Sequence, residues 1–315
     1  MSIEVVVMER EARMYTDALA PAFPDVVFHA ALTEAESLPA CANADVIIGL
    51  GPYITPRMAA AGTRLRWIQA LTTGTDTVEA LPLAPEVIIT SGRGIHGPQM
   101  AELAFLTMMS LSRDFPAMLT NQRARKWERW PQRLLLGKTA VLVGVGVISE
   151  EIASRCKAFG MHVIGVSSAR ESAPGFDEIM PRARLREAAA RAHFLLVLVP
   201  LTPETTGMID AGVLAAMRPD GVLVNMARGP VVDEAALVEA LRSEPDRWRR
   251  ARRVRGRTPA ARISALGHAE RDRDAACRRH GGRVRATDPA AAETQPGGLH
   301  RRQDGRHAQR RATRE

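Results

Sequence analysis

Cysteine is scarce in this sequence: among 315 residues there are three, Cys41, Cys156 and Cys277, at wide and unrelated spacings. Such spacings form neither a disulfide framework nor a cluster of metal ligands, and they suit a reducing compartment. We therefore expect a cytoplasmic protein without a metal. The sequence also lacks a long apolar run and a secretion signal after Met1, which argues against secretion and against a membrane partner.

Lysine is absent from residues 244–315, and Trp248 is their only aromatic residue. This segment holds 20 Arg and 9 acidic residues, so it carries a charge of +11 and the residues before it carry −3 of the total of +8. A nucleic-acid-binding tail would need aromatic stacking or an amphipathic basic helix, and the segment has neither. We therefore expect no nucleic-acid partner and a disordered tail.

Residues 1–243 alternate short β-rich runs with helical patterns, which predicts parallel sheets covered by helices. The predicted strands are 3–7, 26–29, 46–50, 67–70 and 87–90 in a first series, and 139–143, 162–166, 194–199 and 222–225 in a second. The predicted helices are 9–19, 34–41, 98–113 with a continuation to 130, 149–159, 184–192, 211–217 and 234–242. We expect an α/β protein with two Rossmann-like or flavodoxin-like doubly wound domains, the second incomplete.

The first motif with chemical meaning is a glycine turn between a predicted strand and a predicted helix, VLVGVGVISE at residues 141–150. Gly144 permits a tight turn, and Gly146 lets the backbone approach a pyrophosphate that the free N–H groups of the helix N-terminus stabilise. This context predicts a dinucleotide site, with an ordinary strand-to-helix turn as the alternative. Ser149 stands at the third glycine position, and we expect it to loosen the packing of the helix on the strand.

The end of the next predicted strand lacks the acidic residue that would accept hydrogen bonds from the adenosine ribose. It reads Ser167-Ser168-Ala169-Arg170 instead. Without a carboxylate nothing there repels a 2′-phosphate, and two hydroxyls and a guanidinium can bind one. We therefore expect NAD(P) as the cofactor, with NADP preferred over NAD. The alternative is that Arg170 is a solvated surface residue.

Two more motifs follow predicted strand ends, where α/β sheets bind ligands. They are PLTPETTG at residues 200–207 and NMARG at residues 225–229. Arg228 lies just beyond an apolar run, a position suited to presenting a planar, bidentate donor to a carboxylate. Its alternative role is structural, in an ion pair with Asp233 or Glu234.

Taken in this order, the three motifs resemble those of the D-isomer-specific 2-hydroxyacid dehydrogenases, which include glyoxylate/hydroxypyruvate reductases, D-lactate dehydrogenases and phosphoglycerate dehydrogenases. The resemblance extends from residue 1 to about residue 242. It implies hydride transfer between NAD(P)H and a small 2-keto acid, giving a D-2-hydroxy acid, in a homodimer. It also implies a substrate-binding domain at residues 1–104 and a dinucleotide-binding Rossmann domain at residues 105–243.

The resemblance implies individual site residues as well. The loop Thr73-Gly74-Thr75 is similar to the one whose backbone N–H groups hold the substrate carboxylate, and Arg228 matches the arginine that binds and polarises the keto acid. His96 is interpreted as a loop residue, because the family's acid–base histidine lies elsewhere. The implied cofactor contacts are Gly144, Gly146, Val147, Ile148, Ser167, Ser168, Arg170, Pro200, Thr205 and Ala227.

The glutamate and the histidine that complete the family's catalytic set are missing. The stretches expected to carry them, Leu-Asp-Val-Phe-x-x-Glu-Pro-Leu-Pro and Asn-Val-x-x-Thr-Pro-His, do not occur in the sequence. When the codons are read one base forward, however, residues 252–261 permit Asp-Val-Phe, Glu and Pro-Leu-Pro, and residues 269–277 permit a stretch that ends in Thr-Pro-His. We hypothesise that a one-base frameshift near residues 243–246 replaced the true C-terminus.

This hypothesis leads to an expectation about the chain as written. Without the two missing catalytic residues and the last strands of its second sheet, we expect the product to be inactive and poorly soluble. Two alternatives are a catalytically dead remnant that still binds nucleotide, and a protein with a basic, nucleic-acid-binding tail.

Overall fold

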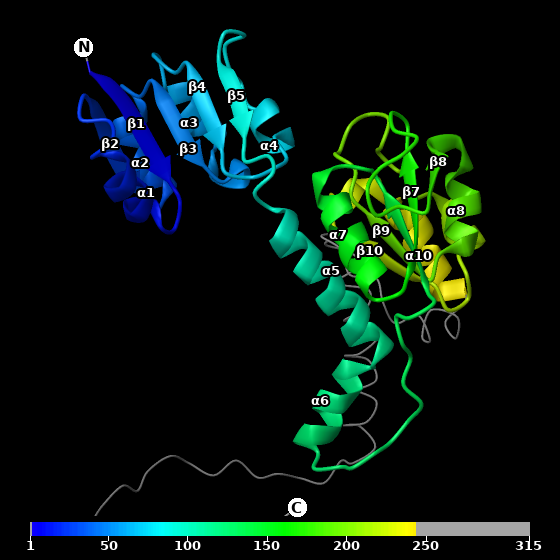
Figure 1. Cartoon of the computed structure of the whole chain (residues 1–315). Coiled ribbons are helices and arrows are strands. Elements are labelled where there is room, and N and C mark those ends of the chain that lie inside the picture. Colours follow the sequence, from blue (N-terminus) through cyan, green and yellow to red (C-terminus); the bar gives the residue numbers. More distant parts are fainter. Residues whose placement is uncertain (1, 244–315) are drawn as a thin grey trace, which may run out of the picture. The chain divides into compact units, whose positions relative to one another are not determined.

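The computed structural model describes residues 2–243 (Figure 1). Within this range the chain forms two five-stranded sheets in which every strand pair is parallel. The predicted disordered tail at residues 244–315 lies outside the described residues. The predicted α/β class is confirmed.

The first sheet has the strand order β2-β1-β3-β4-β5, which is the flavodoxin-like order. Its strands are β1 (Ile3–Met8), β2 (Val26–Ala31), β3 (Val46–Gly49), β4 (Trp67–Ala70) and β5 (Ile88–Ser91). The helices between them are α1 (Ala12–Leu19), α2 (Glu34–Cys41), α3 (Pro56–Ala61) and α4 (Asp76–Glu79). The two short helices α3 and α4 had not been predicted.

Side chains of β1 alternate between two apolar cores, one on each face of the first sheet. Val6 packs in a cluster with Met58 of α3, whereas Val7 packs in a separate cluster with Ala12 of α1. Burial of both faces explains why residues 5–8 of β1 are an unbroken apolar run, since a strand covered on both sides has no polar face.

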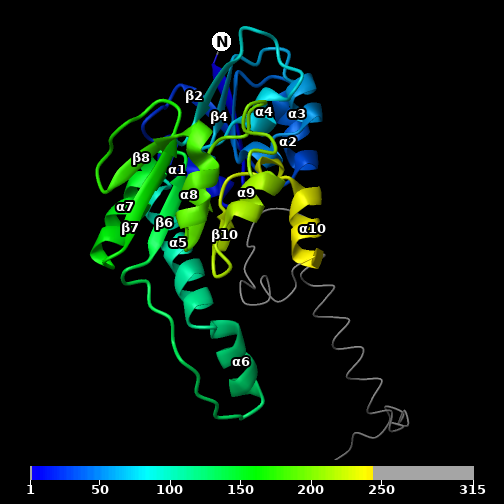
Figure 2. The same cartoon turned by 90° about the vertical axis from the view of Figure 1, so that its right-hand side faces the viewer.

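The second sheet has the strand order β10-β9-β6-β7-β8. Figure 2 labels four of these strands, β10, β6, β7 and β8. Its strands are β6 (Thr139–Val143), β7 (His162–Ser167), β8 (Glu178–Pro181), β9 (Phe194–Val197) and β10 (Val222–Asn225), and its helices are α7 (Val147–Ala158), α8 (Leu185–Arg191), α9 (Ala211–Ala216) and α10 (Glu234–Ser243). Numbered by chain order within this sheet, the strands run 3-2-1-4-5, the Rossmann order without its sixth strand. Within residues 2–243 the sheet ends at β10. The residues that would continue the predicted incomplete domain lie outside the described range.

Strand β6 is central to the second sheet and is covered on both faces. Val141 and Val143 pack in the cluster that includes residues of α8, α9 and α10, and Leu142 packs in the cluster that includes residues of α5 (Gly97–Ser112) and α7. The carboxyl end of β6 is thereby held rigidly, and this is the end from which the glycine turn departs.

The long helix predicted between the two sheets is divided in two. Helix α5 ends at Ser112, and α6 spans Phe115–Arg123. Asp114 between them adopts a left-handed conformation with φ of 51°, which an α-helix cannot contain. The predicted continuation to residue 130 is wrong beyond Arg123, because no helix covers residues 124–130. The proposed boundary between residues 104 and 105 lies inside α5.

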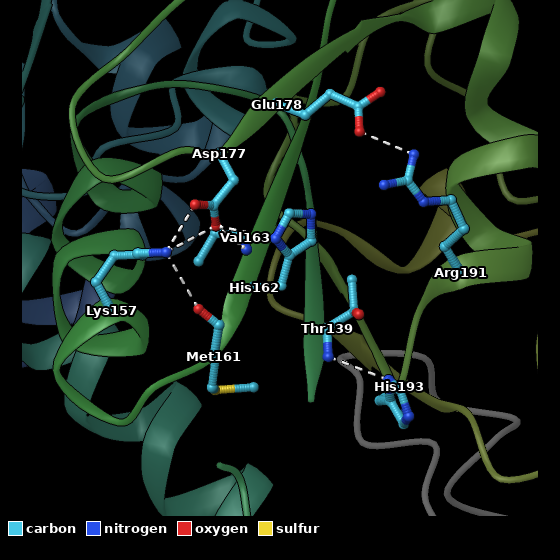
Figure 3. A network of polar contacts seen from close by, with 9 residues as sticks. All are labelled: Thr139, Lys157, Met161, His162, Val163, Asp177, Glu178, Arg191 and His193. Atoms are coloured by element: carbon cyan, nitrogen blue, oxygen red, sulfur yellow. Dashed lines mark hydrogen bonds and ion pairs between the residues drawn. The ribbon is translucent and has the colours of Figure 1, made fainter. Parts of the chain in front are cut away.

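A polar network at the amino ends of β6 and β7 holds β8 in place (Figure 3). Asp177 accepts a hydrogen bond of 2.8 Å from the backbone N–H of Val163, and Nζ of Lys157 lies 2.7 Å from its carboxylate. Burial by itself raises the pKa of Asp177, but these hydrogen bonds outweigh it and hold the pKa below its usual value. Burial also lowers the pKa of His193, whose Nδ1 accepts a 3.0 Å bond from the N–H of Thr139.

Two buried, free thiols lie in different halves of the chain. Cys41 belongs to a core cluster of the first sheet, and Cys156 belongs to a core cluster of the second. Burial raises the pKa of both thiols, and that of Cys156 reaches about 12. Both side chains are therefore protonated packing residues at neutral pH.

Candidate functional site

The predicted cofactor residues lie at the carboxyl ends of β6, β7, β9 and β10 or in the segments that follow these strands. Ser167 is the last residue of β7, and Val147 and Ile148 are the first two residues of α7. These four strands are neighbours in one parallel sheet, so their loops meet at the same edge of the sheet. In α/β folds this is the edge at which ligands bind. The sheet topology thus brings together segments that are up to 83 residues apart in the sequence, from Gly144 to Thr205 and Ala227.

The glycine turn is crowded at Gly144 and open at Gly146. Gly144 has a φ of +100°, and an ideal Cβ at this position would lie 2.9 Å from Cγ1 and 3.1 Å from N of Val199. Gly146 is the N-cap residue of α7, and an ideal Cβ there would have no neighbour within 4 Å. The space beside Gly146 at the N-terminus of α7 is therefore open, and an anion bound at a helix N-terminus needs such space.

Ser149 does not loosen the turn, contrary to the expectation from the glycine pattern. Its side chain is buried, and its Oγ donates a hydrogen bond of 2.5 Å to the carbonyl oxygen of Gly144. The hydroxyl links the first turn of α7 back to the end of β6. Serine at this position adds a bond that glycine could not make.

The loop after β7 is shaped by one serine and closed by an ion pair. Oγ of Ser167 accepts hydrogen bonds from the backbone N–H groups of Ala169 (3.1 Å) and Arg170 (3.0 Å). Nη1 of Arg170 forms an ion pair with Oε1 of Glu150 in the first turn of α7. Arg170 is therefore not a freely solvated surface residue, and it lies beside the glycine turn. Ser168 is exposed.

Thr205 uses its hydroxyl within its own loop. The side chain is buried, donates a 2.6 Å hydrogen bond to the carbonyl oxygen of Pro200, and accepts a 2.8 Å bond from the N–H of Thr202. Both of these bonds close the turn that follows β9. Thr205 thus holds the loop in which Pro200 is exposed.

Asn225 builds the turn that presents Arg228. Its buried side chain donates a 2.8 Å hydrogen bond to the carbonyl oxygen of Arg228 and accepts a 3.0 Å bond from the N–H of Ala227. The NxARG motif was noticed in the sequence, but Asn225 was not singled out as a site residue. Its position as the polar last residue of an otherwise apolar strand was the available signal.

Arg228 forms a bidentate ion pair with Asp76, which lies 152 residues away in the sequence. Nε of Arg228 is 3.1 Å from both carboxylate oxygens of Asp76, and Nη2 is 2.8 Å from Oδ1. The expected structural partners Asp233 and Glu234 do not take this role, and Asp233 instead caps α10 by accepting a 3.0 Å bond from the N–H of Ala236. Asp76 was missed because no local pattern links it to Arg228.

The loop of Thr73, Gly74 and Thr75 lies directly against the Arg228 guanidinium. An ideal Cβ on Gly74 would overlap Nη2 of Arg228 and would lie 3.2 Å from Cζ. Among the contacts made by residues 2–243, none uses the backbone N–H groups of Thr73, Gly74 or Thr75 as a donor. A cation and unused backbone donors thus face one another, and both are groups that bind a carboxylate.

His96 borders this loop without entering it. It is the N-cap residue of α5, and its Nε2 lies 3.2 Å from the carbonyl oxygen of Leu71. Its contact with a backbone carbonyl fits the interpretation as a loop residue. Within residues 2–243, no group of three or more His, Cys, Asp and Glu side chains could hold a metal ion, and no helix is long and apolar enough to cross a membrane.

Comparison with known proteins agrees with this geometry. Residues 105–248 match the family model of the D-isomer specific 2-hydroxyacid dehydrogenase, NAD binding domain. The chain is 32% identical over 219 residues to a D-3-phosphoglycerate dehydrogenase of Mycobacterium tuberculosis, covering 67% of this chain and 39% of that protein. It is 31% identical over 197 residues to a hydroxypyruvate reductase of Thermotoga maritima, covering 62% of this chain and 63% of that protein.

Solved structures show the same likeness. A D-isomer specific 2-hydroxyacid dehydrogenase family protein from Aeromonas salmonicida has a TM-score of 0.71 at 27% identity, covering 77% of this chain and 78% of that one. An NADPH-dependent glyoxylate/hydroxypyruvate reductase from Sinorhizobium meliloti, in complex with NADP and sulfate, has a TM-score of 0.66 at 25% identity, covering 77% and 78%.

The sequence matches leave part of each relative unmatched. The chain spans about two fifths of the length of the curated phosphoglycerate dehydrogenases that it matches, and just under two thirds of the hydroxypyruvate reductase. The family-model match ends at residue 248, next to the position at which the sequence changes character. The glycine turn, the fold of both sheets and these likenesses all indicate the same family. The chain belongs to the D-isomer specific 2-hydroxyacid dehydrogenase family.

Proposed function

We propose that this chain derives from an enzyme that transfers hydride between NADP(H) and a small 2-keto acid, with a D-2-hydroxy acid as the reduced product. The observation that carries the proposal is the contact between Gly74 and Arg228, where a guanidinium lies beside unused backbone donors. That pairing can hold the carboxylate and the adjacent carbonyl of a 2-keto acid. Residues 1–104 would supply the carboxylate loop, and residues 105–243 would supply the arginine and the cofactor site.

The residues at the edge of the second sheet fit a dinucleotide. Gly144 and Gly146 leave room for a pyrophosphate at the N-terminus of α7, where partial positive charge stabilises it. Ser168 and Arg170 lie at the end of β7, where the adenosine ribose is expected. The absence of an acidic residue in the loop 167–170 favours NADP, the cofactor bound in the Sinorhizobium meliloti relative.

The chain's own residues would act on the substrate by position and charge. The bound cofactor supplies the hydride. The N–H groups of Thr73, Gly74 and Thr75 would anchor the substrate carboxylate, and Arg228 would stabilise the negative charge that develops on the carbonyl oxygen. Asp76 holds two of the three nitrogen atoms of the Arg228 guanidinium, which orients the group before the substrate binds.

The proposed reaction also needs a proton donor, and the sequence lacks the residues that supply one in this family. The family's glutamate and histidine belong to two stretches that the sequence lacks. We therefore propose that the chain as written binds cofactor and keto acid without turning them over, which makes it a nucleotide-binding remnant unless its reading frame is repaired. Because binding does not need a proton donor, binding measurements test the site directly.

Replacing Arg228 with Gln is expected to weaken the binding of oxamate, an unreactive analogue of a 2-keto acid, by about tenfold to a hundredfold, since a charge-assisted hydrogen bond contributes roughly 1.5–3 kcal/mol. Calorimetric titration in saturating NADPH measures the effect. Arg218→Gln is the matched control. Arg218 also pairs with a carboxylate, that of Asp220 at 2.9 Å, but it lies before the amino end of β10 and not after its carboxyl end. Equal oxamate affinity in the Arg228→Gln variant and the unmodified chain would contradict the proposed substrate site.

We also propose that two copies of the chain associate through α5. One side of α5 packs on the second sheet through Ala104 and Met108. Its other side leaves Leu103, Leu106 and Met109 exposed at three-residue intervals. This apolar stripe suits a second copy, since an exposed patch of this kind marks a protein interface.

Leu106→Glu is expected to raise the dissociation constant of the dimer at least about tenfold, because a charge at the centre of an apolar contact is left without a partner. Sedimentation velocity over a concentration series measures it. Met14→Glu serves as the control, since Met14 is 59% exposed and Leu106 is 56% exposed, but Met14 lies on α1. Sedimentation of the unmodified chain as a monomer throughout the series would overturn this part of the proposal.

A further inference from the structure

We propose that Glu150 sets the selectivity of the cofactor site between NADP(H) and NAD(H), by occupying Arg170 and by placing a negative charge beside it. This inference rests on the proposed function, because it concerns the same cofactor site. It goes beyond that function by naming a residue that opposes the cofactor which Arg170 favours.

The position of Glu150 is determined by the glycine turn. Gly146 caps α7, and Glu150 lies in the first turn of that helix. Oε1 of Glu150 pairs with Nη1 of Arg170, and the two side chains are 31% and 39% exposed. The pair therefore joins the phosphate-binding helix to the loop after β7, and partial burial shields it from solvent.

The ion pair with Glu150 uses one nitrogen atom of the Arg170 guanidinium, Nη1. An arginine has five N–H donors on three nitrogen atoms. Among the contacts made by residues 2–243, those of the Arg170 side chain involve only Nη1 and Glu150. Nε and Nη2 are thus available to a 2′-phosphate, but that phosphate must bind close to the Glu150 carboxylate, and like charges at this range repel one another.

The pair is not needed to shape the loop. Oγ of Ser167 already accepts the N–H groups of Ala169 and Arg170 and holds the turn independently of Glu150. Removing the charge of Glu150 should therefore release Arg170 without reshaping the backbone. A purely structural pair would instead affect every adenosine ligand alike.

The test uses two small ligands that differ only by the 2′-phosphate, namely 2′,5′-ADP and 5′-AMP. Each is titrated calorimetrically into the full chain and into Glu150→Gln, Arg170→Gln and Glu151→Gln. Glu151 is the matched control, because it is the adjacent carboxylate of α7 and pairs with a different arginine, Arg155, one turn along the helix. The melting temperature of each variant verifies that it folds as the unmodified chain does.

The expected result is that Glu150→Gln tightens 2′,5′-ADP binding about three- to tenfold and changes 5′-AMP binding less than about twofold, which is the scale of a partly exposed ion pair. Arg170→Gln should weaken 2′,5′-ADP alone, and Glu151→Gln should change neither ligand. If Arg170→Gln weakens 2′,5′-ADP but Glu150→Gln leaves it unchanged, or shifts both ligands equally, the role of Glu150 is refuted and the proposed function stands. If the unmodified chain binds neither ligand, the proposed function fails and this inference fails with it.

Discussion

Deleting one base within the codons for residues 243–246 is expected to raise the turnover of hydroxypyruvate and glyoxylate with NADPH at least about a hundredfold over the chain as written. The repaired frame would restore a histidine and a glutamate beside Arg228, and a positioned proton donor contributes roughly 10²–10⁴-fold to such a reaction. The measurement is the loss of NADPH absorbance, with both purified chains compared at equal concentration.

The control for this experiment is the repaired chain with its restored histidine replaced by glutamine. This variant keeps the completed sheet but lacks the proton donor, so it separates the chemical effect from better folding. Comparable turnover by the 315-residue chain itself would refute the frameshift hypothesis as an explanation of lost activity. Resequencing the coding DNA across residues 241–257 shows whether the shift belongs to the gene.

Gly144→Ala is expected to lower the free energy of unfolding by about 2–4 kcal/mol, which is the largest stability effect that we anticipate from a single methyl group. A left-handed backbone costs a residue with a Cβ roughly 1–2 kcal/mol. The added Cβ would also lie 2.9 Å from Cγ1 of Val199 and 3.1 Å from its backbone nitrogen, and the backbone cannot move aside cheaply. Urea unfolding followed by circular dichroism measures the change.

Gly207→Ala separates the two causes of this loss. Gly207 has a φ of +65°, and no atom lies within 4 Å of its ideal Cβ. This variant should therefore lose only the conformational part, about 1 kcal/mol. Equal losses from Gly144→Ala and Gly207→Ala would show that the close approach of Val199 is not the cause.

Gly146→Ala is expected to weaken the binding of NADPH and to leave the free energy of unfolding unchanged. The space around an ideal Cβ at Gly146 is open, so the fold should tolerate a methyl group there. The same methyl group would occupy the position at which the backbone approaches the pyrophosphate. We expect NADPH affinity to fall at least about tenfold, and unaltered affinity would place the phosphates elsewhere.

The strands were predictable wherever burial on both faces left a local signature. The predicted strands at residues 139–143 and 222–225 coincide with β6 and β10 to the residue, because a strand covered on both sides is a nearly continuous apolar run. Strand β8 was missed for the opposite reason. It is four residues long at the edge of the sheet, begins with Glu178 and ends with Pro181, so its position depends on the Asp177 network and not on its own composition.

The candidate site divides in a similar way. Gly144 and Gly146 were identifiable because a glycine turn between a strand and a helix is a local pattern in the sequence. The partners Asp76 and Glu150 were not identified, because each acts through a side chain whose target lies in another segment. Ser149 is a third case. The glycine pattern predicts looser packing where serine replaces the third glycine, but the Ser149 hydroxyl donates a hydrogen bond to the carbonyl oxygen of Gly144. Spacing predicts backbone requirements, whereas ion pairs depend on the assembled fold.

The reactivity of the two buried thiols reports how often the structure around each of them opens. Cys41 and Cys156 lie in different cores, and a buried, protonated thiol reacts with a disulfide reagent only during the moments when its surroundings open. The reaction rate of each thiol therefore measures how often its own half of the molecule opens. Comparing the rate of each thiol in this chain with its rate in the frame-repaired chain shows which core is weakened by the change of sequence at residue 244.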